Sequence, residues 1–192
     1  MGLIACLLLA VCLCAGEAGA STIWLAQTNG QNMNDPDQWK NSVTSNTMTT
    51  ERGSWSSSTS DIFQANGKTG IVINADFTAE KISTADEDGA GAGVAGGGFT
   101  VSSGPRTITA GLQAGTTQCL LTSGTGYQLD IVGPISAAAT GGTARGLNVA
   151  TALSAVNITG NITAGVALGV YNQSTAPINV SNSTITAGLL IS

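Results

Sequence analysis

The chain reads Phe77-Thr78-Ala79 and returns to the same pattern at Ile108-Thr109-Ala110, Ile135-Ser136-Ala137, Ile162-Thr163-Ala164 and Ile185-Thr186-Ala187. Successive copies lie 31, 27, 27 and 23 residues apart. Each copy follows two apolar residues separated by one position: Ile71/Ile73, Phe99/Val101, Leu129/Ile131, Val156/Ile158 and Ile178/Val180. A repeat of this length is typical of a solenoid, in which each turn of the chain stacks on the turn before it.

Within each repeat, apolar residues alternate with polar ones, as in β-strands with one buried face. A third strand-like stretch follows three of the copies, at 119–121, 147–149 and 168–170. The pattern predicts an all-β fold at residues 69–192. We expect a single-stranded, right-handed parallel β-helix with three faces and about five rungs, a rung being one turn of the helix.

The polar positions of the repeated motif predict a column of hydroxyl groups on the outside of this helix. If the five copies stack on one another, their Ile and Ala side chains face the core and their hydroxyl side chains face solvent. Such a column can hydrogen-bond from rung to rung. The expected outward ladder comprises Thr78, Thr109, Ser136, Thr163 and Thr186.

The two ends of the solenoid differ in sequence. Residues 21–68 carry all three tryptophans and no copy of the motif. We interpret this segment as the N-terminal cap, because a solenoid needs an atypical unit to cover its first rung. The sequence ends at Ser192, inside an expected strand. We expect either that the helix is truncated there and continues in a longer protein, which we favour, or that its open edge associates end to end with another copy.

The first 20 residues have the pattern of a signal peptide. An uninterrupted apolar run at 3–14 precedes small residues that end in Ala18-Gly19-Ala20, as at a secretory cleavage site. Twelve apolar residues are too few to cross a bilayer, so we expect no membrane span. The segment predicts a secreted or cell-surface protein. Three of the four cysteines lie in this leader, which leaves Cys119 as a lone thiol.

Composition excludes several classes of function. Charged residues make up 9% of the 192 residues, the net charge is −5, and six Lys and Arg are scattered singly. A nucleic-acid partner is therefore not expected, because its phosphates require clustered positive charge. The chain has no His, the commonest general base and metal ligand. We name no catalytic residue, because no pair of acids has the spacing that glycoside cleavage requires, and we expect no enzyme.

Two groups of residues are candidates for binding. Asp86, Glu87 and Asp88 form the densest acidic cluster, and clustered oxygens in a turn could hold Ca²⁺. A solvated loop is the simpler interpretation, and no other cofactor is expected. Trp24, Trp39 and Trp55 could stack on sugar rings, or they could close the apolar end of the column. We favour the second interpretation, because the chain has only eight aromatic residues.

Several stretches resemble one family of proteins. They are Asp61-Ile-Phe-Gln-Ala-Asn66-Gly67, Asp76-Phe77-Thr78-Ala79, Gly97-Gly98-Phe99-Thr100-Val101 and Arg106-Thr107-Ile108-Thr109-Ala110. The chain from about residue 55 onward is similar to secreted and phage-associated parallel β-helix surface proteins, akin to autotransporter passengers and adhesins. The resemblance implies a β-helix with a structural or adhesive role and carries over no catalytic residue.

Together these observations predict an exported, non-catalytic β-solenoid that acts as a structural or adhesive protein at the cell surface. Its expected partners are glycans or other cell-surface components. One alternative is a β-helix of the tailspike or pectin-lyase kind that binds or processes carbohydrate. A second alternative is a virion appendage protein, although such a protein has no evident need for a signal peptide.

Overall fold

A computed structural model describes residues 20–83, 98–114, 120–123, 126–137, 145–149 and 153–191. The predicted leader up to Gly19, the cluster Asp86-Glu87-Asp88 and Cys119 lie outside these residues. Within them, no helix has the length and apolar character needed to cross a membrane.

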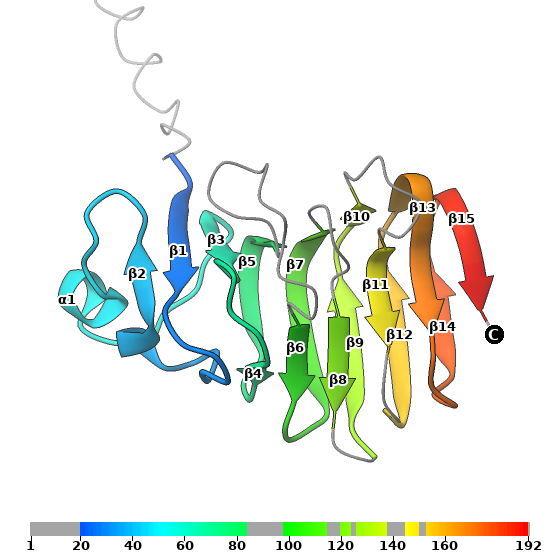
Figure 1. Cartoon of the computed structure of the whole chain (residues 1–192), viewed down its shortest axis with the longest axis horizontal. Coiled ribbons are helices and arrows are strands. Elements are labelled where there is room, and N and C mark those ends of the chain that lie inside the picture. The colour runs from blue at the N-terminus through cyan, green and yellow to red at the C-terminus, as the bar shows by residue number, and fades with distance from the viewer. Residues whose placement is uncertain are drawn as a thin grey trace, which may run out of the picture.

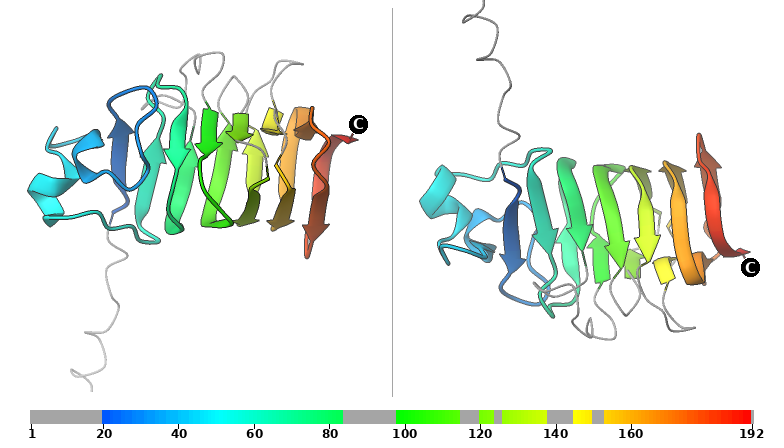
Figure 2. Two further views of the ribbon diagram at one scale, coloured as in Figure 1. Left: turned by 90° about the horizontal axis from the view of Figure 1, so that it is seen from below. Right: turned by 90° about the horizontal axis from the view of Figure 1, so that it is seen from above.

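The chain forms an all-β column in which the strands follow one another along the long axis (Figures 1 and 2). Two short helices lie at the N-terminal end, and the last strand lies at the opposite end (Figure 1). The elements of the N-terminal region are β1 (Thr22–Ala26), η1 (Pro36–Gln38), β2 (Trp39–Asn41), α1 (Met48–Arg52) and β3 (Asp61–Gln64).

The remaining strands form three stacks of parallel pairs. The β4 stack contains β4 (Ile71–Ile73), β6 (Gly98–Val101), β8 (Leu120–Ser123) and β11 (Arg145–Val149). The β9 stack contains β9 (Gln128–Val132), β12 (Ala155–Thr159), β14 (Ile178–Ser181) and the first halves of β5 (Phe77–Ser83) and β7 (Arg106–Ala114). The β3 stack contains β1, β3, β10 (Ile135–Ala137) and the second halves of β5 and β7.

Two long strands join the β3 stack to the β4 stack. β13 (Ile162–Asn172) pairs with β10 through its first residues and with β11 through its last ones. β15 (Ile185–Ile191) pairs with β13 along both parts. The third strand-like stretches expected from the sequence correspond to β8, β11 and the second part of β13, so each turn of the chain contributes to all three stacks.

Columns of apolar side chains fill the interior because the strands pair in register. In the β9 stack the column is Phe77, Ile108, Ile131, Ile158 and Val180. In the β3 stack it is Phe63, Ile82, Leu112, Ile135, Ile162 and Ile185. Most of these side chains are fully buried, so the alternation in the sequence identified the core.

The five copies of the motif do not stack as one series. Phe77 and Ile108 pair with each other in the β9 stack, whereas Ile135, Ile162 and Ile185 stack in the β3 stack. The partner of Ile135 is Leu112, four residues after Ile108. The sequence repeat therefore moves by one face between its second and third copies. Counting positions between copies could not reveal this, because both faces accept the same alternating pattern.

Two glycines make the corner between the β9 and β3 stacks. Gly133 has φ +155° and Gly160 has φ +146°, values that residues with a side chain rarely adopt. A Cβ atom on Gly133 would lie 2.3 Å from the carbonyl oxygen of Ala110, and one on Gly160 would lie 2.3 Å from that of Gly133. The backbones therefore approach so closely that only glycine fits at this corner.

The N-terminal region both covers the column and extends it. β1 pairs in parallel with β3, and β3 pairs in parallel with β5, so parts of the predicted cap segment 21–68 belong to the β3 stack. β2 pairs antiparallel with β1 and ends this stack. Trp24, Trp39 and Phe63 are fully buried there. The chain then turns at Asn66-Gly67 and enters β4.

Candidate functional site

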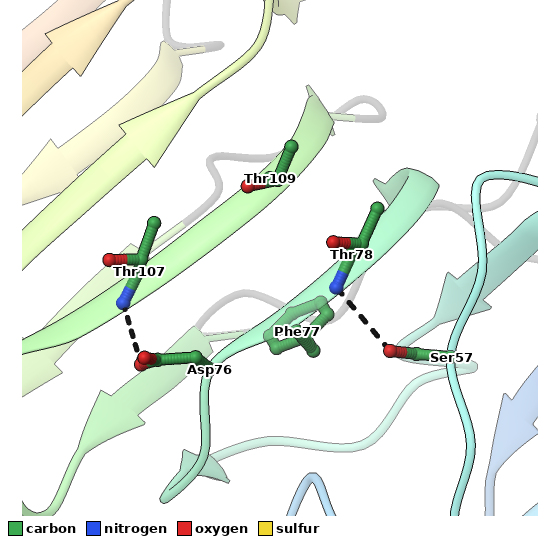
Figure 3. A pocket seen from close by; sticks show the side chains of 6 residues that line it. All are labelled: Ser57, Asp76, Phe77, Thr78, Thr107 and Thr109. Atoms are coloured by element: carbon green, nitrogen blue, oxygen red, sulfur yellow. Dashed lines mark hydrogen bonds between the residues drawn. The ribbon is translucent and has the colours of Figure 1, made fainter.

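A shallow groove opens on the outer face of the β9 stack beside the N-terminal cap (Figure 3). Its volume is about 290 Å³. Ser57 comes from the loop after α1, and Asp76 directly precedes β5. Thr78 lies in β5, and Thr107 and Thr109 lie in β7. Phe77 supplies the apolar part of the lining. The groove therefore combines four hydroxyl groups, one carboxylate and the edge of the core.

Two hydrogen bonds to main-chain amides fix the walls of the groove. The Thr107 N–H donates to Asp76 Oδ1 over 2.9 Å, and the Thr78 N–H donates to Ser57 Oγ over 3.3 Å. Figure 3 shows both bonds. They attach the cap loop to β5 and join β5 to the next rung. Because protein groups already satisfy these two N–H groups, the hydroxyl groups and the carboxylate are the polar groups left to meet a ligand.

The single carboxylate of the groove faces one arginine. Arg106 Nη1 lies 3.9 Å from Asp76 Oδ1, and Arg106 Nη2 donates to Ser103 Oγ over 2.6 Å. The side chain of Asp76 is 63% exposed, so this ion pair adds little stability. It does balance the charge of Asp76, which makes the groove polar but close to neutral.

A column of paired polar residues runs from this groove along the β9 stack, and its side chains hydrogen-bond to one another from Asp130 onward. Thr107 pairs with Asp130, Asp130 with Asn157, and Asn157 with Asn179. Asn157 Nδ2 donates to Asp130 Oδ1 over 2.6 Å, and Asn179 Nδ2 donates to Asn157 Oδ1 over 2.8 Å. Gln128 Nε2 adds a bond to Asp130 over 2.9 Å. This carboxylate–amide ladder was not predicted from the sequence. The signal for it was that Asp130, Asn157 and Asn179 each lie between two apolar residues of the repeat.

The predicted hydroxyl ladder divides into two. Thr78 pairs with Thr109 in the β9 stack, and Ser136, Thr163 and Thr186 pair in sequence in the β3 stack. The residue beside Ser136 on β7 is Gln113, not Thr109. The prediction of one continuous ladder is therefore wrong, for the same change of face that divides the motif. Thr109, Thr163 and Thr186 are exposed, and the other two are half-buried.

The tryptophans lie inside or against the cap. Trp24 and Trp39 are fully buried, and their indole N–H groups donate to Asp61 Oδ1 and to the Met33 carbonyl oxygen, each over 2.9 Å. No ring face of either is open to a sugar. Trp55 is half-buried and stacks on Phe63 at 5.4 Å. It retains some exposed surface two residues from Ser57 of the groove.

The Arg52–Asp61 pair in the cap is the shorter of the two ion pairs found among the described residues. The buried Asp61 carboxylate accepts two bonds from Arg52, at 2.6 and 2.9 Å, together with bonds from Trp24 and from the Ser58 N–H and hydroxyl. Burial alone would raise the pKa of Asp61, but these hydrogen bonds and the charge of Arg52 outweigh it and hold the pKa below its usual value. The guanidinium of Arg52 also lies 4.9 Å over the Trp24 ring.

The described residues contain no cluster of three or more His, Cys, Asp or Glu side chains that could hold a metal ion. Asp86, Glu87 and Asp88 lie outside the described residues, so their calcium site stays a prediction. Comparison with protein-family models found no match, and comparisons with curated proteins and with solved structures found no significant similarity.

Proposed function

We propose that this chain is an exported, right-handed parallel β-helix that serves as a non-catalytic structural or adhesive element at a cell surface. The three parallel stacks support this proposal, because nearly all parallel crossovers in proteins are right-handed. The apolar run at 3–14 and the cleavage-site pattern that ends at Ala20 support export.

The carboxylate–amide ladder is the observation that carries the proposal. Its Asp130, Asn157 and Asn179 side chains hydrogen-bond from rung to rung, an arrangement that stiffens a surface. Catalysis by acid and base needs groups whose pKa values are adjusted to the reaction. Asp61, which has a lowered pKa and lies in the cap, is fully engaged in holding the cap together.

Export can be tested by expressing the full chain with its first 20 residues in a bacterium that has a periplasm. We expect the protein in the periplasm with Ser21 as its first residue, as read by mass spectrometry of the intact chain. A control chain with Leu8→Arg and Leu9→Arg should stay in the cytoplasm, because charge in the apolar run blocks export. Retention of the unmodified chain, with its leader intact, would contradict the proposal.

The non-catalytic role is tested separately. The purified protein is incubated with pectin, alginate, dextran and peptidoglycan, and the release of reducing ends is followed over hours. We expect the same background as a boiled sample. Steady release from any one polymer would replace this proposal with the lyase or hydrolase alternative.

A further inference from the structure

We propose that the groove formed by Ser57, Asp76, Phe77, Thr78, Thr107 and Thr109 binds a neutral saccharide. This inference rests on the proposed adhesive role and names the class of ligand. It places binding at the junction of the cap and the β9 stack, not on the buried faces of Trp24 and Trp39. Three features of the groove lead to it.

The first feature is the set of polar groups. The four hydroxyl groups can each donate and accept one or more hydrogen bonds, and the carboxylate of Asp76 can only accept. Sugar hydroxyls need this mixture, because each of them is both a donor and an acceptor. Two main-chain N–H groups in the wall already donate to Asp76 and Ser57, so these two side chains are held in place before a ligand arrives.

The second feature is charge. Asp76 and Arg106 balance each other at 3.9 Å, and the hydroxyl groups carry no charge. An acidic sugar would find no excess of positive charge here and would meet the carboxylate of Asp76 directly, with that of Asp130 beside Thr107. A neutral ligand suits these surroundings, because it can bond to the carboxylate without losing the hydration of a charge of its own.

The third feature is shape. The volume of about 290 Å³ lies at the lower end of the range for sites that hold small molecules. The methyl groups of Thr78, Thr107 and Thr109 give the wall of the groove some apolar surface, whereas the Phe77 ring is only 5% exposed and forms the floor. The polar column Thr107–Asp130–Asn157–Asn179 continues from the groove with one residue per rung, so a chain of sugars has further partners beyond the first unit.

The test uses the full chain after removal of its leader, labelled with ¹⁵N, and four probes. Three are neutral glucose hexamers: cellohexaose, maltohexaose and laminarihexaose. The fourth is hexagalacturonic acid, which is of similar size but carries a carboxylate on every unit. We expect saturable shifts of the amide signals of Thr78, Thr107 and Thr109 with at least one neutral hexamer. The signals of Thr163 and Thr186, on the β3 stack, should not move.

Two matched variants show whether the groove is responsible. Thr109→Val removes one hydroxyl from the groove and keeps the shape of the side chain, and Thr163→Val makes the same change at an exposed strand position on another stack. Thr109→Val should weaken binding about five-fold, the change expected for loss of one neutral hydrogen bond, and Thr163→Val should not alter it. Asp76→Asn should weaken binding of the neutral hexamer and reduce the discrimination against the acidic one.

Three results would overturn the inference: no shifts with any neutral hexamer at millimolar concentration, tighter binding of the acidic hexamer, or equal weakening by Thr109→Val and Thr163→Val. Failure here is distinguishable from failure of the proposed function. A chain that is exported but binds none of the sugars loses the inference and keeps the structural role. A chain that binds sugar through the groove but is not exported keeps the inference and loses the proposed function.

Discussion

At the scale of single residues, Asp61 is the group on which the cap depends most. Its fully buried carboxylate meets Arg52 from α1, Trp24 from β1 and Ser58 from the intervening loop. One side chain therefore holds α1 and the loop that follows it against Trp24 of β1, which lies 37 residues earlier in the sequence than Asp61. The sequence places Asp61 beside a strand and gives no sign of this role, because the partners of a buried acid are fixed by the tertiary fold.

Asp61→Asn should destabilise the protein by about 3 kcal/mol at pH 7, because it removes one partner of a buried ion pair and leaves the charge of Arg52 unbalanced. Folding lowers the pKa of Asp61, so its contribution is complete above the unfolded carboxyl pKa of about 3.9 and is lost as the pH falls through the folded-state value. Urea unfolding of both proteins between pH 7 and pH 2 measures this.

The exposed Asp37→Asn is the control for this measurement and should change the free energy of unfolding by less than about 0.5 kcal/mol at every pH. If the difference between Asp61→Asn and the unmodified protein stayed constant down to pH 2, the ionised pair would not be its cause.

A second prediction at the scale of single residues concerns the contribution of Gly160 to stability. Gly160→Ala should cost about 3 kcal/mol, because the added Cβ meets the Gly133 carbonyl oxygen and the backbone is in a region that alanine avoids. Gly126→Ala is the matched control: its φ is also positive, at +95°, but nothing lies within 4 Å of the added Cβ. We expect about 1 kcal/mol there. Equal losses in chemical denaturation would show that crowding at the corner is not decisive.

At the scale of strands, the sequence predicted the elements well and their partners less well. The alternating residues located β4, β9, β12 and β14, and the core columns contain the predicted Ile and Val side chains. The sequence wrongly predicted that Ile108 and Ile135 stack on each other; Ile135 pairs with Leu112 instead. β5 and β7 pass around a corner as single long strands, whereas later rungs break there into β9 and β10 at Gly133. Both arrangements give the same alternation of polar and apolar residues, so the sequence pattern does not distinguish one long strand from two short ones.

Disulfide trapping tests this register. With Cys119→Ser as background, the pair Gln113→Cys and Ser136→Cys should cross-link on mild oxidation, because these residues are direct partners on neighbouring strands. The pair Thr109→Cys and Ser136→Cys, which the simple repeat would place together, should stay reduced. Mass spectrometry of the intact chains distinguishes the two outcomes, and a cross-link in the second pair alone would restore the single ladder.

At the scale of the whole molecule, stability passes from rung to rung. Each strand of the column bonds to the strands directly before and after it in its stack. A substitution in one strand should therefore destabilise the neighbouring strands most. The groove could not be predicted from the sequence for a related reason. Ser57 and Thr109 are 52 positions apart, and the apposition of the cap loop with β7 depends on the packing of the complete N-terminal end.

Trp39→Phe should reveal this local transmission. The change removes the bond to the Met33 carbonyl and part of the contact with Phe63, at a cost of about 2 kcal/mol. Amide hydrogen exchange should accelerate in β1, β2 and β3 and remain near its original rate in β12 and β14. Uniform acceleration along the chain would instead indicate that the column unfolds as one cooperative unit.

The glycine corner has a consequence for how this column can change its length. Gly133 and Gly160 occupy equivalent places in consecutive rungs, and Val132 and Thr159 pair directly before them. Excision of residues 133–159 would join Val132 to Gly160 and bring Asn179 beside Asp130, with every remaining strand facing a partner of the same register. The natural unit of insertion, deletion or modular redesign is thus this 27-residue block, which begins at one glycine corner and ends just before the next.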